Sequence, residues 1–199
     1  SMAVSDLMAF ALGGMELWVD AAVYPDGISR KISPGDEIRW QMHYHKETGP
    51  GTGVYDQSQM ALKFYPEGAE IKYQMQGNAL GRFDFEIPAG DPNYTIKQES
   101  TFSHASQIVQ FLPHMHLRGK SAKYEAFYPD GKSEILLDVP QYDFNWQTTY
   151  QYKDFKKVPA GTKVVYTSGW DNSTKNTYNP DPAKAVRWGE PTTDEMSFG

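Results

Sequence analysis

The chain has 199 residues, with 19 basic and 25 acidic side chains and a formal net charge of −6. This acidic balance argues against nucleic acid or an anionic lipid surface as the main partner. The sequence contains no cysteine, which excludes disulfides, iron–sulfur clusters, zinc–cysteine sites and thiol catalysis. Aromatic residues make up 14% of the chain beside 17 glycines and 13 prolines, a combination typical of an all-β protein.

The N-terminal segment 7–19 is the most apolar part of the chain. It is too short to cross a bilayer and contains Glu16, so we expect no membrane span. No basic residue precedes it, so it does not resemble a signal peptide. Ser1 and Met2 are typical of a cloning remnant, and we expect the natural chain to begin further upstream.

Seven short segments are rich in Val, Ile, Tyr, Phe and Trp and are bounded by turn residues, a pattern that predicts strands. In chain order they are 37–45, 58–65, 93–99, 107–112, 122–128, 139–144 and 163–170. No long segment follows the helical period of 3.6 residues. Between the predicted strands, the Gly-, Pro- and polar-rich segments 46–53 and 171–182 are expected to be long surface loops.

The pattern Tyr-Pro-Asp/Glu-Gly occurs three times, at 24–27, 65–68 and 128–131. Proline presets φ at the second turn position, and glycine tolerates the positive φ that often follows, so we expect each copy to close a hairpin or a strand connection. A second echo, a Pro/Gly turn before an alternating strand, occurs at 34–40 and 159–166. These echoes favour one or two packed β-sandwich units with a boundary near 87–92.

Four of the five histidines lie in two His-x-His pairs; the five are His43, His45, His104, His114 and His116. In a strand, residues i and i+2 point to the same face at about 6.5–7 Å, whereas a helix would splay them by about 200°. The second pair follows the predicted strand 107–112, so its imidazoles can bind one metal ion; the alternative is two surface histidines at a strand edge. His104 is isolated in a Ser-rich turn, and we interpret it as a plain polar residue.

Without cysteine, a third ligand must come from Asp, Glu, Met or another His, and the notable candidates are Asp194, Glu195 and Met196. A His₂Met set selects copper, because the soft thioether suits Cu(I). A set completed by a carboxylate suits zinc or non-haem iron. The simple alternative for the methionine is a core residue that fills a gap.

The segment 114–116 (His-Met-His), followed far along the chain by 195–196 (Glu-Met), resembles the copper type II, ascorbate-dependent monooxygenases. This family includes peptidylglycine α-hydroxylating monooxygenase and dopamine β-monooxygenase, and the similarity is to its bacterial branch. The resemblance runs from about residue 32 to residue 198. It is supported by the motifs at 41–44, 117–119, 144–147, 171–173 and 179–182.

The resemblance implies two jelly-roll-like antiparallel β-sandwich domains, here 1–90, truncated upstream, and a copper-binding domain at 91–199. It implies a catalytic copper held by His114, His116 and Met196, which activates O₂ to hydroxylate a C–H bond of a small molecule or peptide. Ascorbate is then the expected reductant, and a redox partner or an upstream domain is expected. The family context implies a secreted bacterial protein, periplasmic or extracellular.

The first domain of that family carries an electron-transfer copper with three histidines, one of which matches His43. The adjacent His-His pair that supplies the other two is absent from this sequence. His45 either completes a different metal site with His43 or is exposed. The competing function is therefore a non-catalytic copper-binding or electron-transfer module. A third alternative is a carbohydrate-binding sandwich with a tryptophan platform, drawn from Trp40, Trp146, Trp170 and Trp188.

Overall fold

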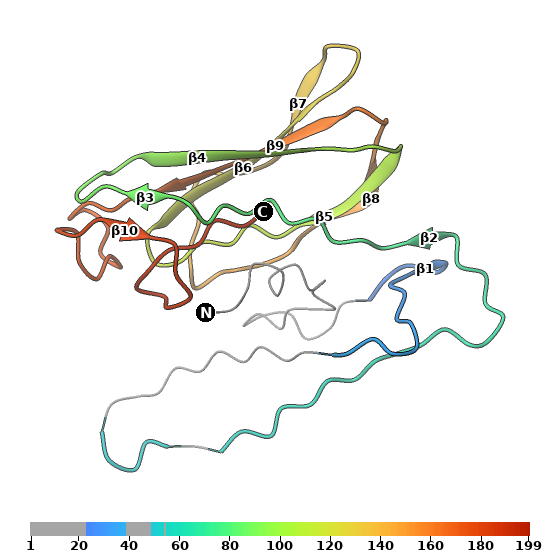
Figure 1. Ribbon diagram of the computed structural model, residues 1–199, viewed down its shortest axis with the longest axis horizontal. Coiled ribbons are helices and arrows are strands. Elements are labelled where there is room, and N and C mark those ends of the chain that lie inside the picture. Colours follow the sequence, from blue (N-terminus) through green and yellow to red (C-terminus); the bar gives the residue numbers. More distant parts are fainter. Residues whose placement is uncertain (1–22, 39–48, 54) are drawn as a thin grey trace. The chain divides into compact units, whose positions relative to one another are not determined.

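The computed structural model describes residues 23–38, 49–53 and 55–199 (Figure 1). His43, His45 and the motif 41–44 lie outside the described residues, as does most of the predicted strand 37–45. Within the described ranges the protein is all-β and has no helix, so none there is long and apolar enough to cross a membrane. These residues divide into two compact units, Val23–Gln76 and Gly77–Gly199.

The smaller unit contains one parallel pair of short strands, β1 (Ile28–Ser29) and β2 (Tyr73–Gln74). The amide of Lys72 donates to Gly27 O at 2.8 Å and joins the two chain segments. The segment 58–65, predicted as a strand, has exposed side chains and no strand assignment, and it pairs with none of the described strands, so this prediction was wrong. A β-rich composition does not make a strand unless a partner takes up its backbone donors and acceptors.

The larger unit is built on a four-stranded antiparallel sheet with the order β4-β9-β6-β7 (Figure 1). A second antiparallel pair is β5-β8, and a short third pair is β3-β10. In chain order the strands are β3 (Glu86–Ile87), β4 (Tyr94–Thr101), β5 (Ser106–Phe111), β6 (Gly119–Phe127), β7 (Ser133–Val139), β8 (Tyr150–Val158), β9 (Lys163–Trp170) and β10 (Val186–Arg187). Residues 77–90, expected in the first domain, belong to this unit.

One hydrophobic core joins the four-stranded sheet to the β5-β8 pair. Central strand β9 contributes Tyr166 and Trp170, both fully buried, and β5 and β8 contribute Ile108 and Val158. The Phe111 ring of β5 packs on Tyr124 of β6 with centroids 4.2 Å apart. The connections that leave this core, β5 to β6 and β7 to β8, carry the candidate functional residues.

Four of the predicted strands are confirmed, because 93–99, 107–112, 122–128 and 163–170 overlap β4, β5, β6 and β9. The prediction for 139–144 was wrong, since β7 ends at Val139 and a loop follows. The sequence pattern also missed β8, which contains three lysines and an aspartate. This strand pairs only with β5 and has many exposed side chains, so it can be polar without losing its ladder.

The three Tyr-Pro-Asp/Glu-Gly segments are all turns with positive φ at glycine, as predicted. The φ values are 79° at Gly27, 79° at Gly68 and 86° at Gly131. The third turn closes a hairpin between β6 and β7, whereas no strand borders the second turn at 65–68, so the expectation of a strand connection was wrong for that copy. The first turn leads into β1, and the residues before Val23 lie outside the described ranges. Turn chemistry is local, whereas the pairing of the flanking segments is not.

Candidate metal centre

His114 and His116 lie in the connection between β5 and β6, on extended backbone. His114 forms an antiparallel bridge with Phe198: its amide donates to Phe198 O at 2.9 Å, and the Phe198 amide donates to His114 O at 3.1 Å. The two imidazole centroids are 5.2 Å apart, with the rings at 86° to each other. The spacing of two residues thus brings both rings together, as the extended backbone requires.

The ring of His114 is oriented by Gln147. His114 Nδ1 lies 2.5 Å from Gln147 Oε1, while Gln147 Nε2 donates to Phe144 O at 3.0 Å. Because the amide nitrogen is committed to a carbonyl, the amide oxygen faces the imidazole, and Nδ1 is the protonated nitrogen in the neutral ring. Nε2 is then the nitrogen with the lone pair.

The ring of His116 is oriented in the same sense by the main chain. His116 Nδ1 lies 3.1 Å from the carbonyl oxygen of Asp194, which can only accept a hydrogen bond. Nδ1 therefore carries the proton and Nε2 the lone pair. An imidazole that donates through one nitrogen to a protein oxygen is the arrangement found for metal-bound histidines.

Met196 lies on the same side as the two histidines by register. The paired residues of an antiparallel bridge point to the same face, so the side chains of Phe198 and His114 share a face. Met196 precedes Phe198 by two residues on extended backbone and therefore points to that face as well. The alternate residues Glu195 and Ser197 both bond to side chains of β9, Trp170 and Ser168, at 3.0 and 2.8 Å. The methionine therefore points away from that sheet, and it is buried.

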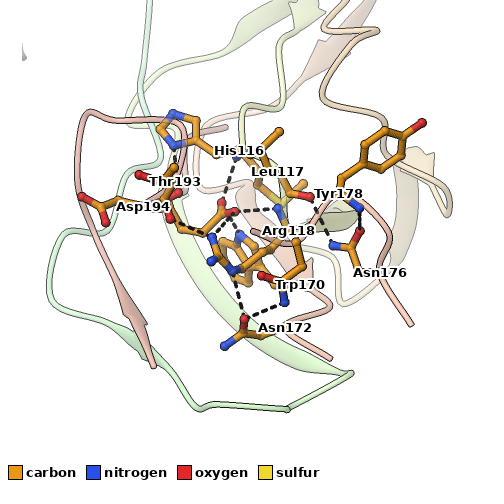
Figure 2. A network of polar contacts seen from close by, with 12 residues as sticks. His116, Leu117, Arg118, Trp170, Asn172, Asn176, Tyr178, Thr193 and Asp194 are labelled. Carbon is orange, nitrogen blue, oxygen red and sulfur yellow. Dashed lines mark hydrogen bonds and ion pairs between the residues drawn. The ribbon is translucent and has the colours of Figure 1, made fainter. Parts of the chain in front are cut away.

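Glu195 is fully buried, and both its oxygens are engaged; Figure 2 shows the polar network around three of its partners, His116, Arg118 and Trp170. Oε2 accepts from the His116 amide at 2.9 Å and from the Trp170 indole at 3.0 Å, and Oε1 accepts from the Arg118 amide at 2.7 Å. This carboxylate thus binds backbone and indole donors, which disfavours a His₂-carboxylate site. No cluster of three or more His, Cys, Asp or Glu side chains suited to a metal occurs in the part of the chain that the structure describes.

Arg118 accompanies this carboxylate and is itself almost completely buried. Its Nη1 lies 4.0 Å from Glu195 Oε1, and it donates through Nε to Asn172 at 2.9 Å and through Nη1 to Thr193 O at 2.8 Å. Burial raises the pKa of Glu195 to about 7, against the hydrogen bonds and the guanidinium charge that lower it. Burial lowers the pKa of the Arg118 guanidinium, and the negative charge of Glu195 opposes this shift in part.

Asn172 anchors the loop that covers Arg118, although 171–182 was predicted as a surface loop. Its side chain is fully buried and donates to Pro88 O at 2.8 Å and Lys184 O at 2.9 Å. Its Oδ1 accepts from Arg118 and from Asn179. The prediction was wrong for Asn172 because the polar side chains of this loop bond inward to backbone carbonyls.

The segment 114–118, called the His-x-His turn below, also contacts the loop 140–149. Tyr142 Oη donates to Met115 O at 2.7 Å and accepts from Met115 N at 3.1 Å. A Cβ at Gly119 would lie 2.7 Å from the Tyr142 ring, so this close approach requires glycine. Sequence reasoning missed Tyr142 and Arg118 as site residues; Arg118 and Gln147 stood only inside the motifs 117–119 and 144–147.

The remaining candidates lie elsewhere. His104 is exposed between β4 and β5, in agreement with a plain polar residue. Trp170 is fully buried in the core, so it contributes nothing to a sugar platform. Trp40 lies outside the described residues.

No known protein-family model matches the sequence. A search of curated proteins likewise finds no match.

Proposed function

We propose that this chain is the copper-binding part of an ascorbate-dependent monooxygenase, with one copper at His114, His116 and Met196. The observation that carries the proposal is the matched orientation of the two imidazoles. Each ring bonds through Nδ1 to an oxygen of this chain, Gln147 Oε1 or Asp194 O, so that Nε2 is the nitrogen that carries the lone pair of the neutral ring. Two histidines on one short turn are thus prepared as nitrogen ligands.

The donor set favours copper over zinc or iron. The carboxylate of Glu195 is committed to N–H donors, and the register of the bridge between His114 and Phe198 directs the buried side chain of Met196 to the histidine side. Imidazole suits both copper states and thioether suits Cu(I). Bound copper would supply the redox chemistry by which O₂ is reduced and a C–H bond is hydroxylated.

The residues of this chain orient and enclose that centre. Hydroxylation by O₂ takes up two electrons and two protons and releases water, and ascorbate supplies the electrons. Gln147 and the Asp194 carbonyl orient the two imidazole rings. Tyr142 binds the backbone of Met115 between the histidines, and Glu195 binds the backbone amide of His116. The substrate is a small molecule or peptide in a periplasmic or extracellular setting. The fold proposal is a jelly-roll-like β-sandwich, supported by the core that joins the two sheets.

A non-catalytic copper-binding or electron-transfer module is the second candidate. It is favoured by one feature of the sequence, the absence of an adjacent His-His pair for an electron-transfer copper. The two functions differ in turnover, because only the monooxygenase hydroxylates a substrate with ascorbate and O₂. The isolated chain is expected to produce peroxide slowly and to hydroxylate a glycine-extended peptide or a phenethylamine poorly.

Metal content and copper competition titrations test the proposal. The purified chain, loaded with Cu(I) or Cu(II), should hold about one copper, and His114→Ala or His116→Ala should each lower the affinity for both states. His104→Ala is the matched control and should leave the affinity unchanged. Equal copper binding by His114→Ala and the unaltered chain would overturn the proposal. Slow peroxide production from ascorbate and O₂ that His114→Ala abolishes would support the monooxygenase part, and bound copper without any such reaction would favour the module.

A further inference from the structure

The side chain of Glu195 accepts the hydrogen bond of the His116 amide that a backbone carbonyl would accept in a regular strand ladder. After the bridge between His114 and Phe198, a continued antiparallel ladder would pair the His116 amide with the Met196 carbonyl. The His116 amide instead donates to Glu195 Oε2 at 2.9 Å, and the Arg118 amide donates to Glu195 Oε1 at 2.7 Å. One carboxylate thus holds two amides that lie two residues apart on the His-x-His turn.

Every polar contact of this carboxylate is an N–H donor. Besides the two amides, the Trp170 indole donates to Oε2 at 3.0 Å, and the Arg118 guanidinium lies 4.0 Å from Oε1. The Glu195 side chain has no exposed surface, so water cannot replace a lost acceptor. A side-chain amide here would direct an NH₂ group at N–H donors, so a glutamine cannot reproduce the contacts.

Two successive residues of the C-terminal segment bind His116, and Met196 comes directly after them. The Asp194 carbonyl bonds the imidazole Nδ1, the Glu195 carboxylate bonds the backbone amide, and Met196 follows directly. We propose that Glu195 is a positioning residue that holds the thioether of Met196 beside Nε2 of His116, so that both reach one metal ion. This inference rests on the proposed copper site and assigns Glu195 no contact with the metal.

The proposal predicts a selective change in metal binding by Glu195→Gln. The variant should keep copper on the two histidines but lose the sulfur ligand, because the residue next to Met196 no longer binds the amides of His116 and Arg118, even though the bridge of Phe198 with His114 remains. We expect about a 10-fold or larger loss of Cu(I) affinity and a smaller loss of Cu(II) affinity. X-ray absorption of the Cu(I) form should show the copper–sulfur scattering weakened or absent.

The control is Val158→Ala, a buried residue of β8 whose ladder partner is Ser106, the first residue of β5. It should lower the melting temperature while the ratio of Cu(I) to Cu(II) affinity and the sulfur scattering stay unchanged. Glu195→Asp is the second variant, because it keeps the charge but is too short to hold both amides. It should fall between the unaltered chain and Glu195→Gln in the affinity ratio.

The outcomes separate this inference from the proposed function. No copper in the unaltered chain would overturn the copper site itself. Copper bound with a sulfur ligand in the unaltered chain, and an unchanged affinity ratio in folded Glu195→Gln, would overturn only the positioning role. Failure of both Glu195 variants to fold would also overturn it, since the residue would then act on the fold as a whole.

Discussion

Two segments that are far apart in the sequence hold the His-x-His turn, and the interactions that they use differ in kind. The C-terminal segment 193–199 and the loop 140–149 each orient one imidazole through Nδ1. The C-terminal segment adds the buried Glu195 carboxylate, which lies 4.0 Å from the buried guanidinium of Arg118 beside the turn, whereas the loop adds neutral hydrogen bonds from half-buried side chains. Water can replace part of what the loop provides, but it cannot reach Glu195. We therefore expect changes to the C-terminal side to cost more.

The largest effect is expected from Arg118→Met, which leaves the buried Glu195 carboxylate without its cation. Loss of one member of a buried ion pair costs about 3–5 kcal/mol of unfolding free energy. Urea denaturation of the metal-free protein measures this loss. The control is Lys123→Met on β6, whose partly exposed ion pair with Glu125 should be worth less than about 1 kcal/mol. Similar losses of unfolding free energy in both variants would contradict the expectation that the buried cation contributes more than the partly exposed one.

Met196→Leu is expected to have the next largest effect, on Cu(I) affinity. Leucine keeps the volume but removes the thioether, so Cu(I) should bind about 100-fold more weakly, or about 2.7 kcal/mol, while Cu(II) changes less. Competition titrations with Cu(I) and Cu(II) chelators measure both. The control is Met115→Leu, a fully buried methionine between the two histidines. Equal losses for both copper states in Met196→Leu would argue against the thioether as a ligand.

Gln147→Leu tests the loop side and should have a smaller effect. It removes the acceptor for His114 Nδ1 and with it the restraint on that ring. We expect about a 10-fold loss of affinity, or about 1.4 kcal/mol, that is the same for Cu(I) and Cu(II). Gln151→Leu, an exposed glutamine of β8, is the control. A loss confined to Cu(I) would mean that the loop, too, governs the sulfur ligand.

The smallest effect is expected from the double variant His43→Ala, His45→Ala, which asks whether any third region holds the metal. Two imidazoles without a further protein ligand should bind copper weakly, so the high-affinity copper should remain. Copper stoichiometry and Cu(I) affinity, compared with His104→Ala, measure this. A large loss would show that the two His-x-His pairs share one site.

The sequence alone determined the features that depend on neighbouring residues. The positive φ at Gly131 and the strands β4, β5, β6 and β9 followed from turn chemistry and apolar alternation. The proximity of His114 and His116 followed from their spacing on extended backbone. These features depend on local dihedral angles and on a side-chain period that the sequence displays directly.

Only the tertiary structure decided which polar residues meet. Glu195 bonds the amide of a residue 79 positions away, and Asn172 is buried although its loop has the composition of an exposed turn. Residues 58–65 stayed unpaired, whereas the polar β8 found a partner in β5. The physical reason is that buried hydrogen bonds and strand ladders need partners from distant parts of the chain. The contribution of these hydrogen bonds to stability depends on whether water is excluded from them, and composition and periodicity do not show where that happens.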